Sequence, residues 1–107
     1  MIYHEYETIY IMRPDLPEPE LERLNGKFDG IIANKDGSLL LREEWGRRKL
    51  AYLVAKHPQG QYCYLNYVGP AGLPGELERN MRLEYNVIRF ITVKLDENVI
   101  PEELVAM

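Results

Sequence analysis

The sequence predicts an α+β domain in which six elements follow one another in the order β-α-β-β-α-β. Four segments are rich in aromatic and β-branched residues and are bounded by turn residues, as is typical of strands. Two other segments carry apolar residues at helical spacing. A chain of 107 residues is long enough for one hydrophobic core and too short for two. We therefore expect one folded domain, over residues 1–95.

The first strand and the first helix are predicted on either side of a proline-rich turn. The strand covers residues 3–12 (YHEYETIYIM) and ends before Pro14, although both of its alternating sets contain apolar residues and leave its inward face open. We expect Asp15 to cap the helix, and Pro17 and Pro19 to fit its first turn. The apolar residues at helical spacing are Leu21, Leu24, Phe28 and Ile31.

The middle of the chain predicts a hairpin of two strands. The second strand covers residues 38–56 and is interrupted at Trp45 and Gly46, where a glycine inside a strand favours a bulge. Residues 57–60 (HPQG) are predicted as a turn. The third strand covers residues 61–68, and its alternation places Tyr62 and Tyr64 on one face and Cys63 on the other.

The last two elements complete a known arrangement. Leu73, Leu77 and Met81 predict a short second helix, and residues 87–95 (VIRFITVKL) predict the fourth strand. This order is the signature of the ferredoxin-like split β-α-β fold, a four-stranded antiparallel sheet with two helices on one face. We expect function on the other face, which the helices leave open. Residues 96–107 have four acids and predict a short mobile tail.

Composition excludes several classes of protein. No apolar run approaches the roughly 20 residues of a membrane span, and the N-terminus lacks a secretory signal pattern. Cys63 is the only cysteine, so no internal disulfide can form. No Cys/His group has the spacing of a metal site, and we expect no cofactor. These features favour a cytoplasmic protein.

The net charge of −4, taken alone, argues against nucleic-acid binding. The distribution of charge along the chain is more informative. Residues 1–22 carry one base against six acids, and residues 95–107 carry four acids and no base. Residues 42–56 carry five bases against two acids, and residues 79–94 carry four against one. Two basic segments therefore lie between acidic ends. A solvated charged surface explains either segment about as well as RNA does.

The sequence offers no convergent set of catalytic groups, and we expect no catalytic residues and no enzyme. His4 and His57 have no evident partner, and Cys63 is better explained as a small core residue than as a nucleophile. Two alternatives stay open. One is a dimeric regulatory module that binds a metabolite through a glycine-rich loop, which residues 13–17 do not provide. The other is a small acid–base enzyme that uses the two histidines.

Tyrosines and basic residues on the strands favour a binding role. Rings on a sheet can stack unpaired bases or pack against a protein, while Arg and Lys neutralise phosphates. The plainer alternative, that the tyrosines merely cover the sheet, has about even weight because aromatic residues favour strands anyway. The residues that fit the binding pattern are Arg48, Lys49, Tyr52, Tyr62, Tyr64, Arg89 and Lys94.

One stretch adds a specific signal: it reads EEWGRRKLAY at residues 43–52 and is followed by PQGQY at residues 58–62. This pattern closely resembles the bacterial small-subunit ribosomal protein six family, and the resemblance extends over roughly residues 3 to 95. Four further segments of this chain are similar to that family: residues 6–7 (YE), 13–16 (RPDL), 86–89 (NVIR) and 93–94 (VK).

The resemblance implies a non-catalytic constituent of the small ribosomal subunit, on a bacterial cytoplasmic ribosome. It implies binding to the central domain of 16S ribosomal RNA together with small-subunit ribosomal protein eighteen, and we expect a monomer when the protein is free. Carried over by position, the expected RNA-binding residues are Arg48, Lys49, Tyr52, Arg82, Arg89 and Lys94. The expected partner-facing residues are Trp45, Leu50, Tyr62 and Tyr64, since aromatic residues are enriched at interfaces.

Overall fold

The structure is a computed structural model that describes residues 3–54 and 57–99, and it confirms the predicted order of elements. Neither helix is long and apolar enough to cross a membrane. The elements are β1 (Tyr3–Met12), α1 (Glu18–Asn34), β2 (Ser38–Val54), β3 (His57–Gly69), α2 (Leu73–Leu83) and β4 (Val87–Val99).

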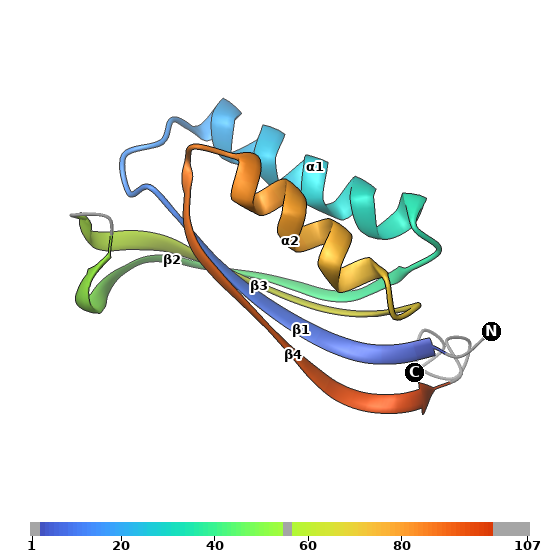
Figure 1. The fold of residues 1–107 in the computed structure, drawn as a ribbon. Helices are drawn as coiled ribbons and strands as arrows, with labels where there is room; N and C mark the ends of the chain where they lie inside the picture. Colours follow the sequence, from blue (N-terminus) through green and yellow to red (C-terminus); the bar gives the residue numbers. More distant parts are fainter. Residues whose placement is uncertain (1–2, 55–56, 100–107) are drawn as a thin grey trace.

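The four strands form one antiparallel sheet in the order β2-β3-β1-β4, as the ferredoxin-like fold requires. Both helices lie on the same face of this sheet (Figure 1). The far end of the β2–β3 hairpin projects past the helices (Figure 1). The described residues place no helix on the opposite face, and we call it the open face.

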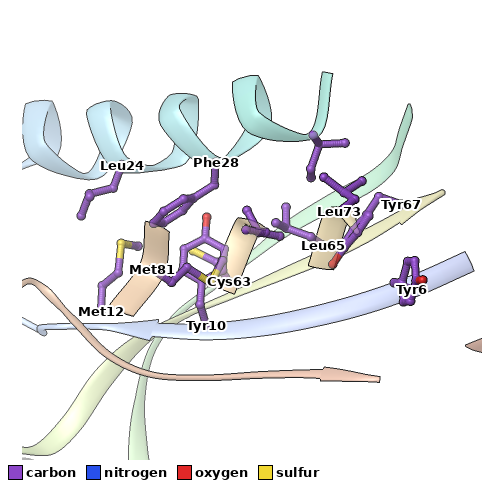
Figure 2. Close-up of a cluster of buried hydrophobic side chains, with 12 residues drawn as sticks. Tyr6, Tyr10, Met12, Leu24, Phe28, Cys63, Leu65, Tyr67, Leu73 and Met81 are labelled. Carbon is purple, nitrogen blue, oxygen red and sulfur yellow. The ribbon is translucent and has the colours of Figure 1, made fainter. Parts of the chain in front are cut away.

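The core lies between the helices and the sheet (Figure 2). The structure settles the inward face of β1: Tyr6, Thr8, Tyr10 and Met12 are buried. Thr8 is satisfied by a 2.8 Å hydrogen bond with the Tyr67 hydroxyl. The other buried residues of this cluster are Leu24, Phe28, Ile32, Cys63, Leu65, Tyr67, Leu73, Leu77 and Met81. They follow the predicted patterns except in α1, where Ile32 is buried and the predicted Leu21 and Ile31 are only partly buried.

The predicted Asp15 cap is wrong. Helix α1 begins at Glu18, its N-cap is Pro17, and no side chain caps it. Pro17 takes this position because its ring fixes φ, here −69°, while its carbonyl accepts hydrogen bonds from the backbone amides of Glu20 and Leu21. Asp15 lies two residues ahead of this N-cap.

The predicted turn at residues 57–60 is also wrong, because β3 already begins at His57. Residues 55–56, between the two strands, lie outside the described part of the chain. Pro58 is tolerated in this strand since β1 pairs with β3 only as far as Gln61, so residues 57–60 have β2 as their one neighbouring strand.

Two features of the strands bear on the site. The β2–β3 register shifts between Glu44 and Gly46, and Gly46 has a φ of +74°, which confirms the predicted interruption of β2. Strand β4 runs to Val99, beyond the predicted end at Leu95. The rest of the expected tail, residues 100–107, lies outside the described residues.

Phe28 tests the packing of α1 on the sheet. Its side chain is fully buried, and its ring meets the edge of Tyr10 at 5.0 Å between centroids. We expect Phe28→Ala to lower the free energy of unfolding by about 3–5 kcal/mol, because it leaves a cavity under the helix. Urea denaturation measures this loss. Leu83→Ala, at an exposed position, is the control and should change stability by no more than about 0.5 kcal/mol. Equal effects of the two changes would contradict this packing.

Candidate nucleic-acid and protein interface

The open face combines apolar and aromatic side chains with carboxylates. Residues that pair across neighbouring strands lie on the same face of the sheet, so the register identifies this surface residue by residue. It is well exposed at its β4 edge, where Ile91 is 58% accessible. The residues that the register places on it include Glu5, Glu7, Ile9, Leu41, Glu43, Tyr64, Asn66, Ile91 and Val93.

Trp45 and Tyr64 form the centre of this surface. Their rings stack with centroids 5.5 Å apart and planes 14° from parallel. The Tyr64 hydroxyl donates a 2.8 Å hydrogen bond to Glu7 Oε2. Two residues further along β3, the Asn66 amide donates a 2.9 Å hydrogen bond to Glu5 Oε2. Residues of β2, β3 and β1 thus hold one another in place, and one side of the Tyr64 ring is covered.

The electrostatic environment of Tyr64 is acidic. Loss of water contact, the hydrogen bond to Glu7 and the negative charges of Glu43 and Glu5 raise the pKa of Tyr64 to about 12. Carboxylates at this density repel phosphate. The centre of the open face therefore suits a basic protein surface better than an RNA backbone.

Several predicted site residues lie in the hairpin that projects past the helices. Arg48 pairs in backbone register with Gly60, and Lys49 pairs with Gln59. Leu50 and Tyr52 follow in the same strand. The side chains of residues 47–54 lie outside what the structure describes, so these residues are located by their backbone positions.

The basic residues predicted at the other end of the chain do not form one patch. Arg89 pairs with Ile11 on the open face, whereas Lys94 pairs with the buried Tyr6 and so belongs to the face that carries the helices. Arg82, near the end of α2, lies with its guanidinium 5.5 Å from the centroid of the Phe90 ring. The set predicted from sequence is therefore spread over both faces and one end of the sheet.

A hydrogen-bonded network under α1 positions β2 just before its bulge. Arg42 donates to both carboxylate oxygens of Asp29 and, at 2.7 Å, to the Tyr10 hydroxyl. That hydroxyl donates to Asn25 Oδ1, and the Asn25 amide donates to Glu44 at 2.8 Å. Burial alone would lower the pKa of Arg42, but the bonds to Asp29 and Tyr10 outweigh it and raise this pKa.

Two further kinds of site are a metal centre and a nucleophilic thiol at Cys63. The described residues contain no group of three or more His, Cys, Asp or Glu residues that could hold a metal ion. Cys63 is buried, as predicted, and burial raises the pKa of its thiol, which disfavours the reactive thiolate. A cavity of about 210 Å³ beside Cys63 is lined mainly by carboxylates and amides, among them Glu18, Glu22, Asn25, Glu44 and Gln61.

Comparisons with known proteins agree with this geometry. The profile of the family described as "Ribosomal protein S6" matches residues 5–94. The small ribosomal subunit protein bS6 of Citrifermentans bemidjiense is 47% identical over 95 residues, which cover 89% of this chain and 71% of that protein. The bS6 protein of Trichlorobacter lovleyi is 41% identical over 102 residues, or 95% and 82% of the two chains.

The chain belongs to the ribosomal protein S6 family. Members of this family are structural proteins of the small ribosomal subunit and not enzymes, so both alternatives left open by the sequence are set aside.

Solved structures support the same fold. The crystal structure of 30S ribosomal protein S6 from Thermotoga maritima superimposes with a TM-score of 0.82 at 30% identity, covering 87% of this chain and 88% of that one. An uncharacterized protein from the same organism has a TM-score of 0.57 at 17% identity, which shows a shared fold alone.

Sequence reasoning missed one feature of the surface. Neither Arg13 nor Tyr85 is among the site residues that the sequence predicts, yet the Arg13 guanidinium lies 4.3 Å from the centroid of the Tyr85 ring. These residues are far apart in sequence, so no local pattern signals the contact. The fold alone brings them together, at the end of the sheet where α2 joins β4.

The acidic environment of Tyr64 can be measured. We expect Glu7→Gln to lower the pKa of Tyr64 from about 12 toward its ordinary value of 10.0, because the substitution removes a negative charge and weakens an acceptor of the hydroxyl. Carbon-13 NMR of labelled tyrosines, followed through alkaline pH, reports this pKa site by site.

The raised pKa of Tyr64 also makes the free energy of unfolding depend on pH. Since the pKa of Tyr64 is higher in the folded chain than in the unfolded one, its contribution is present below pH 10 and is lost as the pH rises toward 12. Glu7→Gln should make this loss smaller. Glu22→Gln, on the exposed side of α1, is the matched control. An unchanged Tyr64 pKa in Glu7→Gln would show that the open face is not acidic at this point.

Proposed function

We propose that the protein binds the central domain of 16S ribosomal RNA together with small-subunit ribosomal protein eighteen and so aids assembly of the small subunit. Membership of the ribosomal protein S6 family supports this proposal. The observation that carries it is the separation of charge. Acids and aromatic rings occupy the centre of the open face. Of the proposed basic residues, Arg48 and Lys49 lie in the β2–β3 hairpin, Arg82 and Arg89 lie at the α2–β4 end, and Lys94 lies on the face that carries the helices.

The open face is the proposed site for the protein partner. Trp45 and Tyr64 offer a stacked aromatic centre, and Glu5, Glu7 and Glu43 surround it with negative charge. Such a surface fits a basic protein, because opposite charges steer the encounter and aromatic residues supply most of the buried contact. Tyr62 and Leu50 extend the proposed contact along the hairpin.

The basic residues are the proposed contacts to RNA. Arg48, Lys49 and Tyr52 in the hairpin, together with Arg82, Arg89 and Lys94, supply charge for phosphates and a ring for a base. The hairpin residues and the two arginines at the α2–β4 end lie on either side of the acidic centre, whereas Lys94 lies on the face that carries the helices. RNA would therefore meet the hairpin and the α2–β4 end while the partner occupies the sheet between them.

Cooperation between RNA and partner follows from the net charge. With four more acids than bases, the free protein repels phosphate at long range and should bind RNA weakly. A basic partner on the open face would neutralise the carboxylates nearest the RNA. We propose that the protein is a monomer until this complex forms on the bacterial cytoplasmic ribosome.

The test is a salt series. Binding of the protein to a central-domain fragment of 16S ribosomal RNA should appear or tighten strongly when purified ribosomal protein eighteen is added, and should weaken as salt rises, because counterions are released from phosphates. Filter binding measures the affinities. Absence of binding at low salt, with and without the partner, would overturn the proposed function.

A variant pair locates the electrostatic contact. Arg89→Ala should weaken RNA binding and reduce the slope of log affinity against log salt by about one, as expected for a single phosphate contact. Arg79→Ala removes the same charge from the exposed face of α2, where Arg79 is paired with Glu76, and serves as the control. Equal effects of the two changes would show that only total charge matters.

A further inference from the structure

We infer that Tyr85, with Arg13 and Arg82, forms a stacking site for one unpaired RNA base at the end of the sheet where α2 joins β4. The inference rests on the proposed RNA binding and assigns one contact of it to residues that the sequence pattern did not indicate. Such a site requires an accessible ring, a fixed position for that ring, and nearby positive charge that is not already neutralised by a carboxylate.

The Tyr85 ring is accessible. It is 80% exposed, more than any other large apolar side chain in the described residues. One side of the ring meets the Arg13 guanidinium, 4.3 Å from the ring centroid, and a ring this exposed has its other side in water. A single exposed tyrosine is ordinary by itself. Its fixed position and its neighbours distinguish this one.

The loop that carries Tyr85 is anchored on both sides of the ring. The backbone amide of Val87 donates to the Glu84 carbonyl at 3.1 Å, and the backbone amide of Arg13 donates to the Asn86 carbonyl at 3.0 Å. The loop is thereby tied to itself and to the end of β1. A ring held in this way loses little conformational entropy when a base stacks on it.

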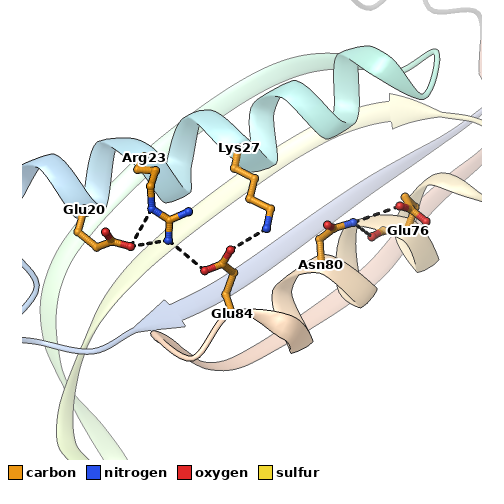
Figure 3. Close-up of polar contacts among 6 residues, drawn as sticks. All are labelled: Glu20, Arg23, Lys27, Glu76, Asn80 and Glu84. Carbon is orange, nitrogen blue, oxygen red and sulfur yellow. Dashed lines mark hydrogen bonds and ion pairs between the residues drawn. The ribbon is translucent and has the colours of Figure 1, made fainter.

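Helix α1 supplies the second anchor (Figure 3). The Glu84 carboxylate accepts hydrogen bonds from Lys27 Nζ at 2.6 Å and from Arg23 Nη2 at 3.1 Å. These two cations lower the pKa of Glu84 and offset its negative charge. The acid nearest to Tyr85 in the sequence is thus neutralised by the helix and does not oppose the approach of a phosphate.

Positive charge remains at this end of the sheet, from Arg13 beside the Tyr85 ring and from Arg82 beside the Phe90 ring. Arg23, Arg42 and Arg79 are ion-paired with carboxylates. Arg13 and Arg82 instead lie over the rings of Tyr85 and Phe90 and take part in none of the ion pairs found among residues 3–54 and 57–99. Their guanidinium groups remain able to contact phosphate from where they are.

This combination fits an unpaired nucleotide better than a protein or a duplex. Bases within a duplex are already stacked on their neighbours, whereas an unpaired base can take a tyrosine ring as its platform while arginines contact its phosphates. A basic protein partner would be repelled by Arg13 and Arg82. The site therefore faces RNA, on the end of the sheet, while the acidic open face remains for the partner.

The test compares variants in full-length protein bound to the central-domain fragment of 16S ribosomal RNA, with ribosomal protein eighteen present. Tyr85→Ala should weaken RNA binding by about five-fold to about a hundred-fold, the range found when a stacked base loses its ring. Tyr85→Phe keeps the ring and should bind nearly as the unaltered protein does. Leu83→Ala, at a neighbouring exposed apolar residue, is the matched control and should have no effect.

The outcomes separate this site from the proposed function. If the unaltered protein binds RNA and Tyr85→Ala binds equally well, the stacking site is wrong and the proposed function stands. Absence of RNA binding by the unaltered protein removes both. If Tyr85→Ala instead weakens binding to ribosomal protein eighteen in the absence of RNA, the ring contacts protein and the assignment to RNA is overturned. Urea denaturation of each variant confirms that it is folded.

Discussion

The hydrogen-bonded network around Arg42 joins four of the six elements and fixes the geometry on which both proposed surfaces depend. Its members come from β1 (Tyr10), α1 (Asn25 and Asp29), β2 (Arg42) and β3 (Cys63). Polar groups under a helix are costly unless each finds a partner, and here each one does. The network holds α1 against the sheet and sets the course of β2 where it approaches its bulge. This network adds to the backbone ladder and the Trp45–Tyr64 stack that join the edge strand β2 to β3.

Because the helices and this network occupy one face of the sheet, the other face and the ends of the sheet are the surfaces available for binding. The bulge after Glu44 permits Trp45 to lie flat on Tyr64, and the strands bring carboxylates of β1 and β2 around that pair. The result is an acidic aromatic surface in the middle of the sheet. Basic residues lie in the projecting hairpin and at the α2–β4 corner, where Arg13 and Tyr85 meet, while Lys94 lies on the face that carries the helices. In the proposed function, one small chain thus offers a protein and an RNA two surfaces of opposite charge.

Local patterns predicted the fold well because periodicity reports which side of an element is buried. The spacing of Leu73, Leu77 and Met81 placed α2, and the alternation along β3 placed Cys63 inside. Patterns did not settle the inward face of β1, where both alternating sets are apolar and only contact with α1 decides. The Asp15 cap and the turn at residues 57–60 were misplaced since both depend on prolines whose effect is set by neighbouring strands and helices. The corner between Arg13 and Tyr85 depends wholly on tertiary structure.

The central claim is that the two partners use different surfaces of this protein. Backbone amide NMR of the labelled protein tests it most directly, first with ribosomal protein eighteen alone and then with the central-domain RNA fragment added. The account predicts that the protein partner shifts the signals of Glu7, Tyr64 and their neighbours on the open face. Addition of RNA should then shift residues 13, 82–86 and 89 while the first set stays largely unchanged. A single set of signals that responds to both partners would contradict the account.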